Sequence, residues 1–140
     1  MAMQLNVIVD LPDLFIGYDV EKDWLYVDWK GVHHQESSQA ACELMLSSLR
    51  AWPCHKILND NSSITHTTMR LTAWSARWLD EMRLTGLQYL AWVLPPGLLA
   101  RQSVETTVLA IDAPRVGTFD DVASAYVWLQ QQHPLVSSYQ

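Results

Sequence analysis

Cysteine is scarce in this sequence and occurs in no motif that would give it a chemical role. The 140 residues include two cysteines, Cys42 and Cys54, which do not form a Cys-x-x-Cys pair. A disulfide framework or a redox motif needs more numerous or more closely spaced cysteines, so neither is indicated. We therefore expect two buried thiols.

Positive charge and long apolar runs are scarce as well. Nine Lys and Arg residues stand against fifteen Asp and Glu residues, and the net charge of -6 repels nucleic-acid phosphates and anionic membrane surfaces. No apolar run approaches the ~18 residues of a membrane span, and the first residues lack the basic start of a secretory signal. We expect a cytoplasmic protein with no nucleic-acid partner and no stable membrane insertion.

The sequence does contain enough apolar residues for a substantial core. Hydrophobic residues make up 49% of the chain and charged residues 17%, a balance typical of a globular domain rather than a disordered chain. A length of 140 residues suits one domain that folds without disulfides or metals. We interpret residues 1–140 as a single domain whose core spans about residues 14–130.

The first third of the chain predicts a β-hairpin followed by a helix. The hairpin strands are residues 15–20 and 24–30, joined by a polar turn, and the second strand alternates in polarity. The helix is capped by Ser37 or Ser38. Its residues at helical spacing, expected to face inward, are Ala41, Met45, Leu49 and Trp52.

The middle of the chain predicts a strand, a polar loop and a second helix. The strand covers residues 55–60 and the loop residues 61–66. Thr67 or Thr68 then caps the helix, and Gly86 ends it, because glycine is favoured just past a helix terminus. The expected inward stripe of this helix is Leu71, Trp74, Trp78 and Met82.

The last third predicts two more strands and two more helical segments. Residues 87–94 are almost continuously apolar, as expected of a strand covered on both faces. A helical stretch covers residues 98–111, a short strand residues 115–119, and Asp120 and Asp121 begin the final helix. The expected inward residues of the final helix are Val122, Ala125, Trp128 and Leu129.

The predicted element order is β-β-α-β-α-β-α-β-α, which defines the fold class as α/β. A hairpin leads into a mostly parallel or mixed sheet of four to five strands, and helices cover the sheet. There are no internal repeats or low-complexity linkers.

This pattern resembles STAS-type anti-sigma-factor antagonist domains, specifically the SpoIIAA-like group, which overlaps the CRAL-TRIO lipid-binding domains. The resemblance covers about residues 14–129. The segments that carry it are Trp29-Lys30-Gly31, Lys56-Ile57-Leu58-Asn59-Asp60, residues 87–93, and Phe119-Asp120-Asp121 with Ala125, Trp128 and Leu129.

The resemblance implies a switch after the third strand. In bacterial antagonists of this family, a serine in an Asp-Ser-Ser-Gly element is phosphorylated, and this changes partner binding. Ser62 matches that serine here, whereas Asn61 replaces the first serine of the element and Ser63 replaces its glycine. Ser62 and Ser63, next to Asp60, are therefore the candidate phosphorylation sites.

Physical reasoning allows two interpretations of this loop. A phosphate there would meet the free amides and the dipole at the start of the next helix. Alternatively, Asn, Ser and Thr are present because they satisfy turn and cap hydrogen bonds locally. If the loop is at the surface, the substitution Ser62→Glu should change partner binding and leave the melting temperature nearly unchanged.

No metal or catalytic site is predicted. His33 and His34 are adjacent, so on an extended segment they point to opposite sides and do not share a metal ion. Ser62, His66 and Asp60 form a nominal triad, but no Gly-x-Ser-x-Gly elbow supports it. We expect a non-enzymatic protein without a cofactor.

The sequence contains seven tryptophans, and two hypotheses about the function of the protein remain open. The first is a regulatory or protein-interaction domain that docks a partner through residues 60–68 and the helix that follows. The alternative is a carrier or sensor of a small apolar or lipid-like ligand, in which Trp74, Trp78 and Trp92 line a pocket rather than only the core. A homodimer formed through an apolar helix face is also expected.

Overall fold

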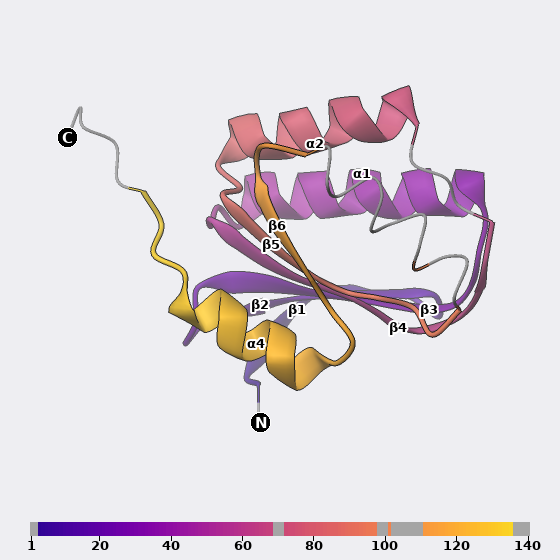
Figure 1. Ribbon diagram of the computed structural model, residues 1–140, viewed down its shortest axis with the longest axis horizontal. Helices are drawn as coiled ribbons and strands as arrows, with labels where there is room; N and C mark the ends of the chain where they lie inside the picture. The colour runs from indigo at the N-terminus through magenta and orange to yellow at the C-terminus, as the bar shows by residue number, and fades with distance from the viewer. Residues whose placement is uncertain (1–2, 69–71, 98–100, 102–110, 136–140) are drawn as a thin grey trace.

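The protein, described here from a computed structural model, is built on a single mixed β-sheet (Figure 1). The structure describes residues 3–68, 72–97, 101 and 111–135. The six strands are β1 (Leu5–Asp10), β2 (Leu14–Asp19), β3 (Trp24–His33), β4 (Lys56–Thr67), β5 (Tyr89–Val93) and β6 (Arg115–Phe119). The helices are α1 (Gln35–Ala51), α2 (Ala73–Thr85) and α4 (Val122–Gln131).

The strands lie in the sheet in the same order as in the sequence. The pairs β1–β2 and β2–β3 are antiparallel, and the pairs from β3 to β6 are parallel. Parallel neighbours need a crossover connection, and α1 and α2 supply the first two. The sheet is therefore mixed, as the element order predicted.

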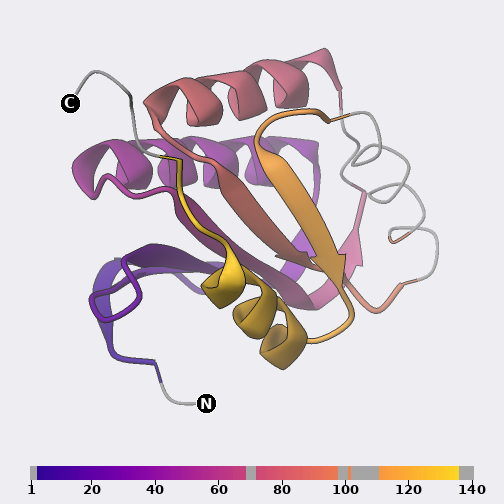
Figure 2. The ribbon, with the colours of Figure 1, turned by 60° about the vertical axis from the view of Figure 1, so that its left-hand side comes forward.

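Helices cover both faces of the sheet (Figures 1 and 2). The helices α1 and α2 lie side by side on one face, and α4 packs on the other face against β4, β5 and β6. The larger hydrophobic cluster lies under α1 and α2 and includes Ile16, Met45 and Leu90, each fully buried. A smaller cluster around Trp24 and Leu58 lies under α4.

The sheet has six strands rather than the four to five predicted. Residues 5–10, predicted to precede the core, form β1 and pair with β2. The register shifts between Val7 and Val9, so a bulge interrupts the alternation of polar and apolar residues. Strict alternation of polar and apolar residues is the pattern that predicts a strand from a sequence, and residues 5–10 lack it because of this bulge.

The predicted starts of α1 and α2 were wrong by a few residues, whereas Asp121 begins α4 as predicted. The helix α1 begins after His34, whose Nδ1 accepts a hydrogen bond from the Ser37 backbone N–H, while Ser37 Oγ accepts one from the His34 N–H. The helix α2 begins after Thr72, which donates its backbone N–H to Ser75 Oγ. Gly86 ends α2 as predicted, with a φ of 123° that side chains disfavour.

The polar loop predicted at residues 61–66 is not a loop. These residues continue β4 as far as Thr67 and pair with the second half of β3. The pairing satisfies their backbone groups, so a polar sequence can remain extended. Leu71 and most of the helical stretch predicted at residues 98–111 lie outside the described residues.

Candidate functional site

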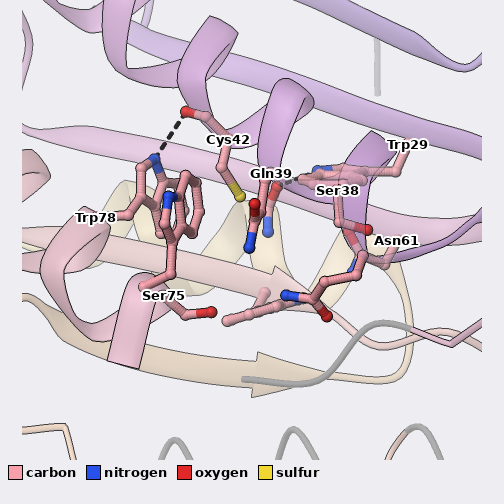
Figure 3. A pocket seen from close by; sticks show the side chains of 11 residues that line it. Trp29, Ser38, Gln39, Cys42, Asn61, Ser75 and Trp78 are labelled. Atoms are coloured by element: carbon pink, nitrogen blue, oxygen red, sulfur yellow. Dashed lines mark hydrogen bonds between the residues drawn. The ribbon is translucent and has the colours of Figure 1, made fainter. Parts of the chain in front are cut away.

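A pocket lies where the middle of β3 and β4 and the end of β5 meet the first turns of α1 and α2 (Figure 3). We call it the tryptophan pocket. Eleven residues line it: Trp29, Gln35, Ser38, Gln39, Cys42, Asn59, Asn61, Trp74, Ser75, Trp78 and Trp92.

The regular spacing of each element directs these side chains to one place. Successive strand residues point to opposite faces, so Asn59 and Asn61 of β4 both point toward α1 and α2. Trp92 of β5 is the register partner of Asn59. In the helices, residues four apart share a face, which brings Trp74 and Trp78 of α2 to the same pocket.

Hydrogen bonds hold two of the tryptophans in position. The Trp29 Nε1–H donates to Asn59 Oδ1 at 2.8 Å, and the Trp78 Nε1–H donates to the Cys42 backbone carbonyl oxygen at 2.7 Å. Figure 3 shows the second bond, which joins α2 to α1. Trp74 is half-buried and also lines a groove between the outer faces of α1 and α2. Its indole therefore forms the outer wall of the pocket.

Three polar atoms of residues that line the pocket lack hydrogen-bond partners within the described part of the chain. They are Ser38 Oγ, Asn61 Oδ1 and Trp92 Nε1, on side chains of residues that are 1%, 2% and 3% exposed. Five buried side-chain atoms are unpartnered in the described residues as a whole, so most of them gather at this one site. Buried polar groups nearly always have partners. The concentration of unpartnered polar atoms here therefore indicates a binding site for a ligand with polar groups.

The described side chains that line the pocket carry no charge. None of the eleven described lining residues is an acid, a lysine, an arginine or a histidine. The only thiol among them belongs to Cys42, and burial, reinforced by Glu43, raises the pKa of that thiol to about 12. A protonated thiol is a poor nucleophile, so the arrangement favours binding over covalent or acid–base chemistry.

The predicted site residues are divided between the two faces of the sheet. Asn61, Trp74 and Trp78 lie in the tryptophan pocket. Ser62 and Ser63 are exposed, and neither they nor Asp60 line the pocket. Sequence reasoning missed the role of Ser38, because a serine inside an amphipathic helix carries no local signal of a binding site.

Asp60 and Ser62 instead form a hydrogen-bonded cluster with Tyr26. The Tyr26 hydroxyl donates to Asp60 Oδ2 at 2.8 Å, and Asp60 Oδ1 accepts from the Ser62 backbone N–H at 2.9 Å and from Ser62 Oγ at 2.6 Å. The predicted electrostatic support for a phosphate at Ser62 is missing, because α2 begins only at Ala73. Asp60 beside Ser62 would repel a phosphate rather than attract it.

Asp28 lies opposite Asp60 in the pairing of β3 with β4. Burial, and secondly the charge of Asp60, raise the pKa of the Asp28 carboxyl to about 6, although Lys30 opposes the rise. Burial, followed by the hydrogen bond to Asp60, likewise raises the pKa of Tyr26. This cluster is an acidic patch rather than a ligand cage, since no group of three or more His, Cys, Asp or Glu converges among the described residues.

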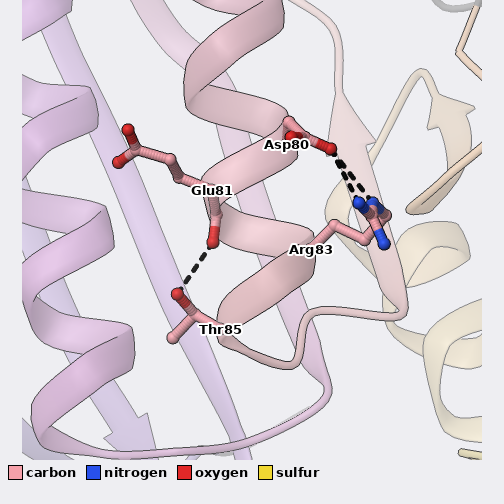
Figure 4. A network of polar contacts seen from close by, with 4 residues as sticks. All are labelled: Asp80, Glu81, Arg83 and Thr85. Atoms are coloured by element: carbon pink, nitrogen blue, oxygen red, sulfur yellow. Dashed lines mark hydrogen bonds and ion pairs between the residues drawn. The ribbon is translucent and has the colours of Figure 1, made fainter.

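The outer face of α2 carries ordinary surface charge (Figure 4). Arg83 Nη2 lies 2.8 Å from Asp80 Oδ1, and the Thr85 hydroxyl donates to the Glu81 carbonyl oxygen. Exposed pairs of this kind contribute little to stability. In the described part of the chain, no helix is long and apolar enough to cross a membrane.

Comparison with known proteins identifies the fold. No family model and no curated protein matches the sequence. Among solved structures, the chain is similar to an uncharacterised protein of the DUF3478 family with a SpoIIAA-like fold, from Shewanella loihica PV-4. The two are 17% identical, the match covers 91% of this chain and 93% of the other, and the TM-score is 0.50. The resemblance inferred from the sequence is thus confirmed at the level of architecture: this protein has a SpoIIAA-like fold.

Proposed function

We propose that this protein is a non-enzymatic domain that binds a small molecule in the tryptophan pocket. The observation that carries the proposal is the set of three unpartnered polar atoms on deeply buried residues that line a pocket together with four tryptophans. Ligand pockets typically combine a mainly apolar lining with a few well-placed polar groups. The proposal keeps the small-molecule binding of the alternative hypothesis in the sequence analysis, but it replaces the apolar or lipid-like ligand of that hypothesis by one that carries polar groups.

The energetics support a guest in this pocket. Leaving a buried donor or acceptor unsatisfied costs about 1–3 kcal/mol for each group. Ser38, Asn61 and Trp92 each carry such a group, and the pocket brings all three to one side of the sheet. A bound molecule that forms hydrogen bonds with these three groups removes this free-energy cost. The ligand-bound state of the pocket is therefore favoured over the empty state.

The neutral lining supports a binding role over a catalytic one. General acid–base catalysis needs a titratable group within reach of the substrate. The described lining offers only the Cys42 thiol, which stays protonated at neutral pH. We therefore place the protein among carriers or sensors.

Native mass spectrometry of freshly purified protein tests the proposal. We expect the wild-type chain to retain a small molecule, or to take one up from a metabolite extract. The substitution Ser38→Leu fills the pocket and should abolish this added mass. Ser47→Leu on the exposed side of α1 is the matched control and should retain it. A bare protein mass for the wild type, both fresh and after incubation with the extract, contradicts the proposal.

A second candidate function is protein docking regulated at Ser62 or Ser63. The observation that favours it is their exposure on β4, at the position where the sequence resemblance places a phosphoserine. Mass spectrometry of the protein isolated from its own cells tests it. Phosphate on the peptide that contains both serines is the expected result, and its absence under all growth conditions argues against this function.

A further inference from the structure

The unpartnered atoms of the tryptophan pocket also define which ligand would fit. We propose that the ligand is a neutral, flat molecule that carries a hydrogen-bond acceptor next to a donor, as in a lactam or another cyclic amide. This inference rests on the proposed function, because it specifies the guest of the same pocket.

The acceptor is required by Trp92. An indole Nε1–H can only donate a hydrogen bond, and this one lies in a residue that is 3% exposed and has no acceptor in the described part of the chain. A purely apolar ligand would leave this donor buried and unsatisfied. The ligand must therefore present a carbonyl oxygen or an equivalent acceptor to Trp92.

The donor is required by Asn61. Its Oδ1 accepts hydrogen bonds and, within the described residues, receives none. Ser38 Oγ, also unpartnered, either donates or accepts and so suits both ends of an amide. A lactam carries an N–H and a carbonyl side by side. In one small group it therefore supplies a donor for Asn61 and an acceptor for Trp92.

Neutrality and flatness follow from the walls of the pocket. A charged ligand would lose its hydration without meeting an opposite charge, because no described lining residue is charged. Trp29, Trp78 and Trp92 line the pocket with indole rings, and aromatic rings favour contact with other flat rings.

The pocket must open before it can hold a ring. The free volume at its centre is about 20 Å³, which is room for about one water molecule. A ring therefore enters only if part of the wall moves, and Trp74 can turn outward toward the groove between α1 and α2 that it also lines. Trp74 is half-buried, as are the lining residues Gln35 and Gln39, whereas Trp29, Trp78 and Trp92 are buried.

Three one-ring probes separate the classes of ligand: 2-pyridone, which is a lactam, benzene, which is apolar, and benzoate, which is an anion. Isothermal titration of the full chain should show 2-pyridone binding at least tenfold more tightly than benzene, and no binding of benzoate. Equal binding of benzene, or tighter binding of benzoate, overturns the ligand class but leaves small-molecule binding standing. Failure of all three probes also overturns the ligand class, and failure together with a bare protein in native mass spectrometry overturns the proposed function as well.

Variants and NMR locate the contact. In the ¹H–¹⁵N spectrum, 2-pyridone should shift the indole N–H signal of Trp92, which is identified by its absence in the variant Trp92→Phe. The variant Asn61→Leu should lose the tenfold preference for 2-pyridone over benzene, whereas Ser47→Ala, altered at an exposed serine of α1, should keep it. An unshifted Trp92 signal during 2-pyridone binding contradicts the assignment. Circular dichroism of each variant checks that it is folded.

Discussion

At the scale of single residues, the Asp28 carboxyl couples the stability of the protein to pH. Its pKa is raised from the ordinary value of 3.8 to about 6, chiefly by burial. Below about pH 4 the carboxyl is protonated in both the folded and the unfolded chain. Between about pH 4 and pH 6 the unfolded chain loses this proton more readily, so the contribution of Asp28 to stability falls as the pH rises.

Replacing this carboxyl by an amide should therefore stabilise the protein at neutral pH. We expect Asp28→Asn to raise the free energy of unfolding at pH 7 by about 1 kcal/mol, a value discounted for solvent screening at a half-buried site. The gain should shrink to nothing below about pH 4. Urea denaturation of both proteins across this pH range measures it, and a gain that is constant with pH would show that the charge of Asp28 is not its cause.

The second prediction at this scale concerns Ser62. Its hydroxyl donates to Asp60, which is 4% exposed, so Ser62→Ala should lower the free energy of unfolding by about 1 kcal/mol. Ser62→Glu should lower it further, because it adds a negative charge beside the carboxylate. The contact with Asp60 thus changes the sequence-based expectation of an unaltered melting temperature.

Ser63 supplies the matched control for this prediction. It is exposed like Ser62, and Ser63→Glu should change stability by no more than about 0.5 kcal/mol. Thermal denaturation at low and high salt compares the two glutamate variants. If both behave alike, the bond from Ser62 to Asp60 is not what the substitution disrupts.

At the scale of elements, one indole joins the two helices above the pocket. Trp78 is 6% exposed and donates its N–H to the Cys42 carbonyl oxygen of α1. The substitution Trp78→Phe keeps an aromatic ring but removes this bond, so we expect a loss of about 1–2 kcal/mol in the free energy of unfolding.

Trp52 is the comparison for this prediction. It was predicted to face inward, but it lies just beyond α1 and is 38% exposed, in contact with Tyr18. Trp52→Phe should change stability by less than about 0.5 kcal/mol. Urea denaturation followed by circular dichroism measures both variants, and equal losses would refute the structural role of the Trp78 bond.

At the scale of the whole molecule, β1 is an edge strand that the sequence did not reveal. Ile8 and Val9 pack against the main core, and β1 covers the edge of β2. Removal of residues 1–10 should lower the free energy of unfolding by about 2 kcal/mol through lost apolar burial. The uncovered edge of β2 should also promote self-association. Urea denaturation and light scattering test both effects, and an unchanged stability would place β1 outside the cooperative unit.

The predicted homodimer remains a prediction at this scale. Exposed large apolar side chains include Leu84 on α2 and Val127 on α4, and these two helices lie on opposite faces of the sheet (Figure 1). Light scattering of the full chain at micromolar concentration measures the mass directly. If the wild type has the mass of a dimer, the variant Leu84→Lys should reduce it to the monomer mass when α2 forms the interface, and Val127→Lys should do so when α4 forms it. A monomer mass for the wild type rules the dimer out.

Sequence alone determined the elements whose pattern is local. The strands near residues 24–30 and 87–94 follow from alternation and from a continuous apolar run, and the end of α2 follows from Gly86, which adopts a positive φ. Both thiols are buried as expected. These features depend on neighbours within a few residues, so short-range periodicity and turn chemistry suffice to predict them.

Only the tertiary structure decided the length of β4 and the composition of the pocket. Residues 61–66 are polar enough to suggest a loop, but β3 offers their backbone a hydrogen-bonded partner along its whole second half. Ser38, Asn61 and Trp92 lie on three different elements, and nothing near any one of them in the sequence indicates the other two. Their meeting depends on the parallel register of the strands and on the packing of α1 over the sheet, which are long-range properties that no local pattern encodes.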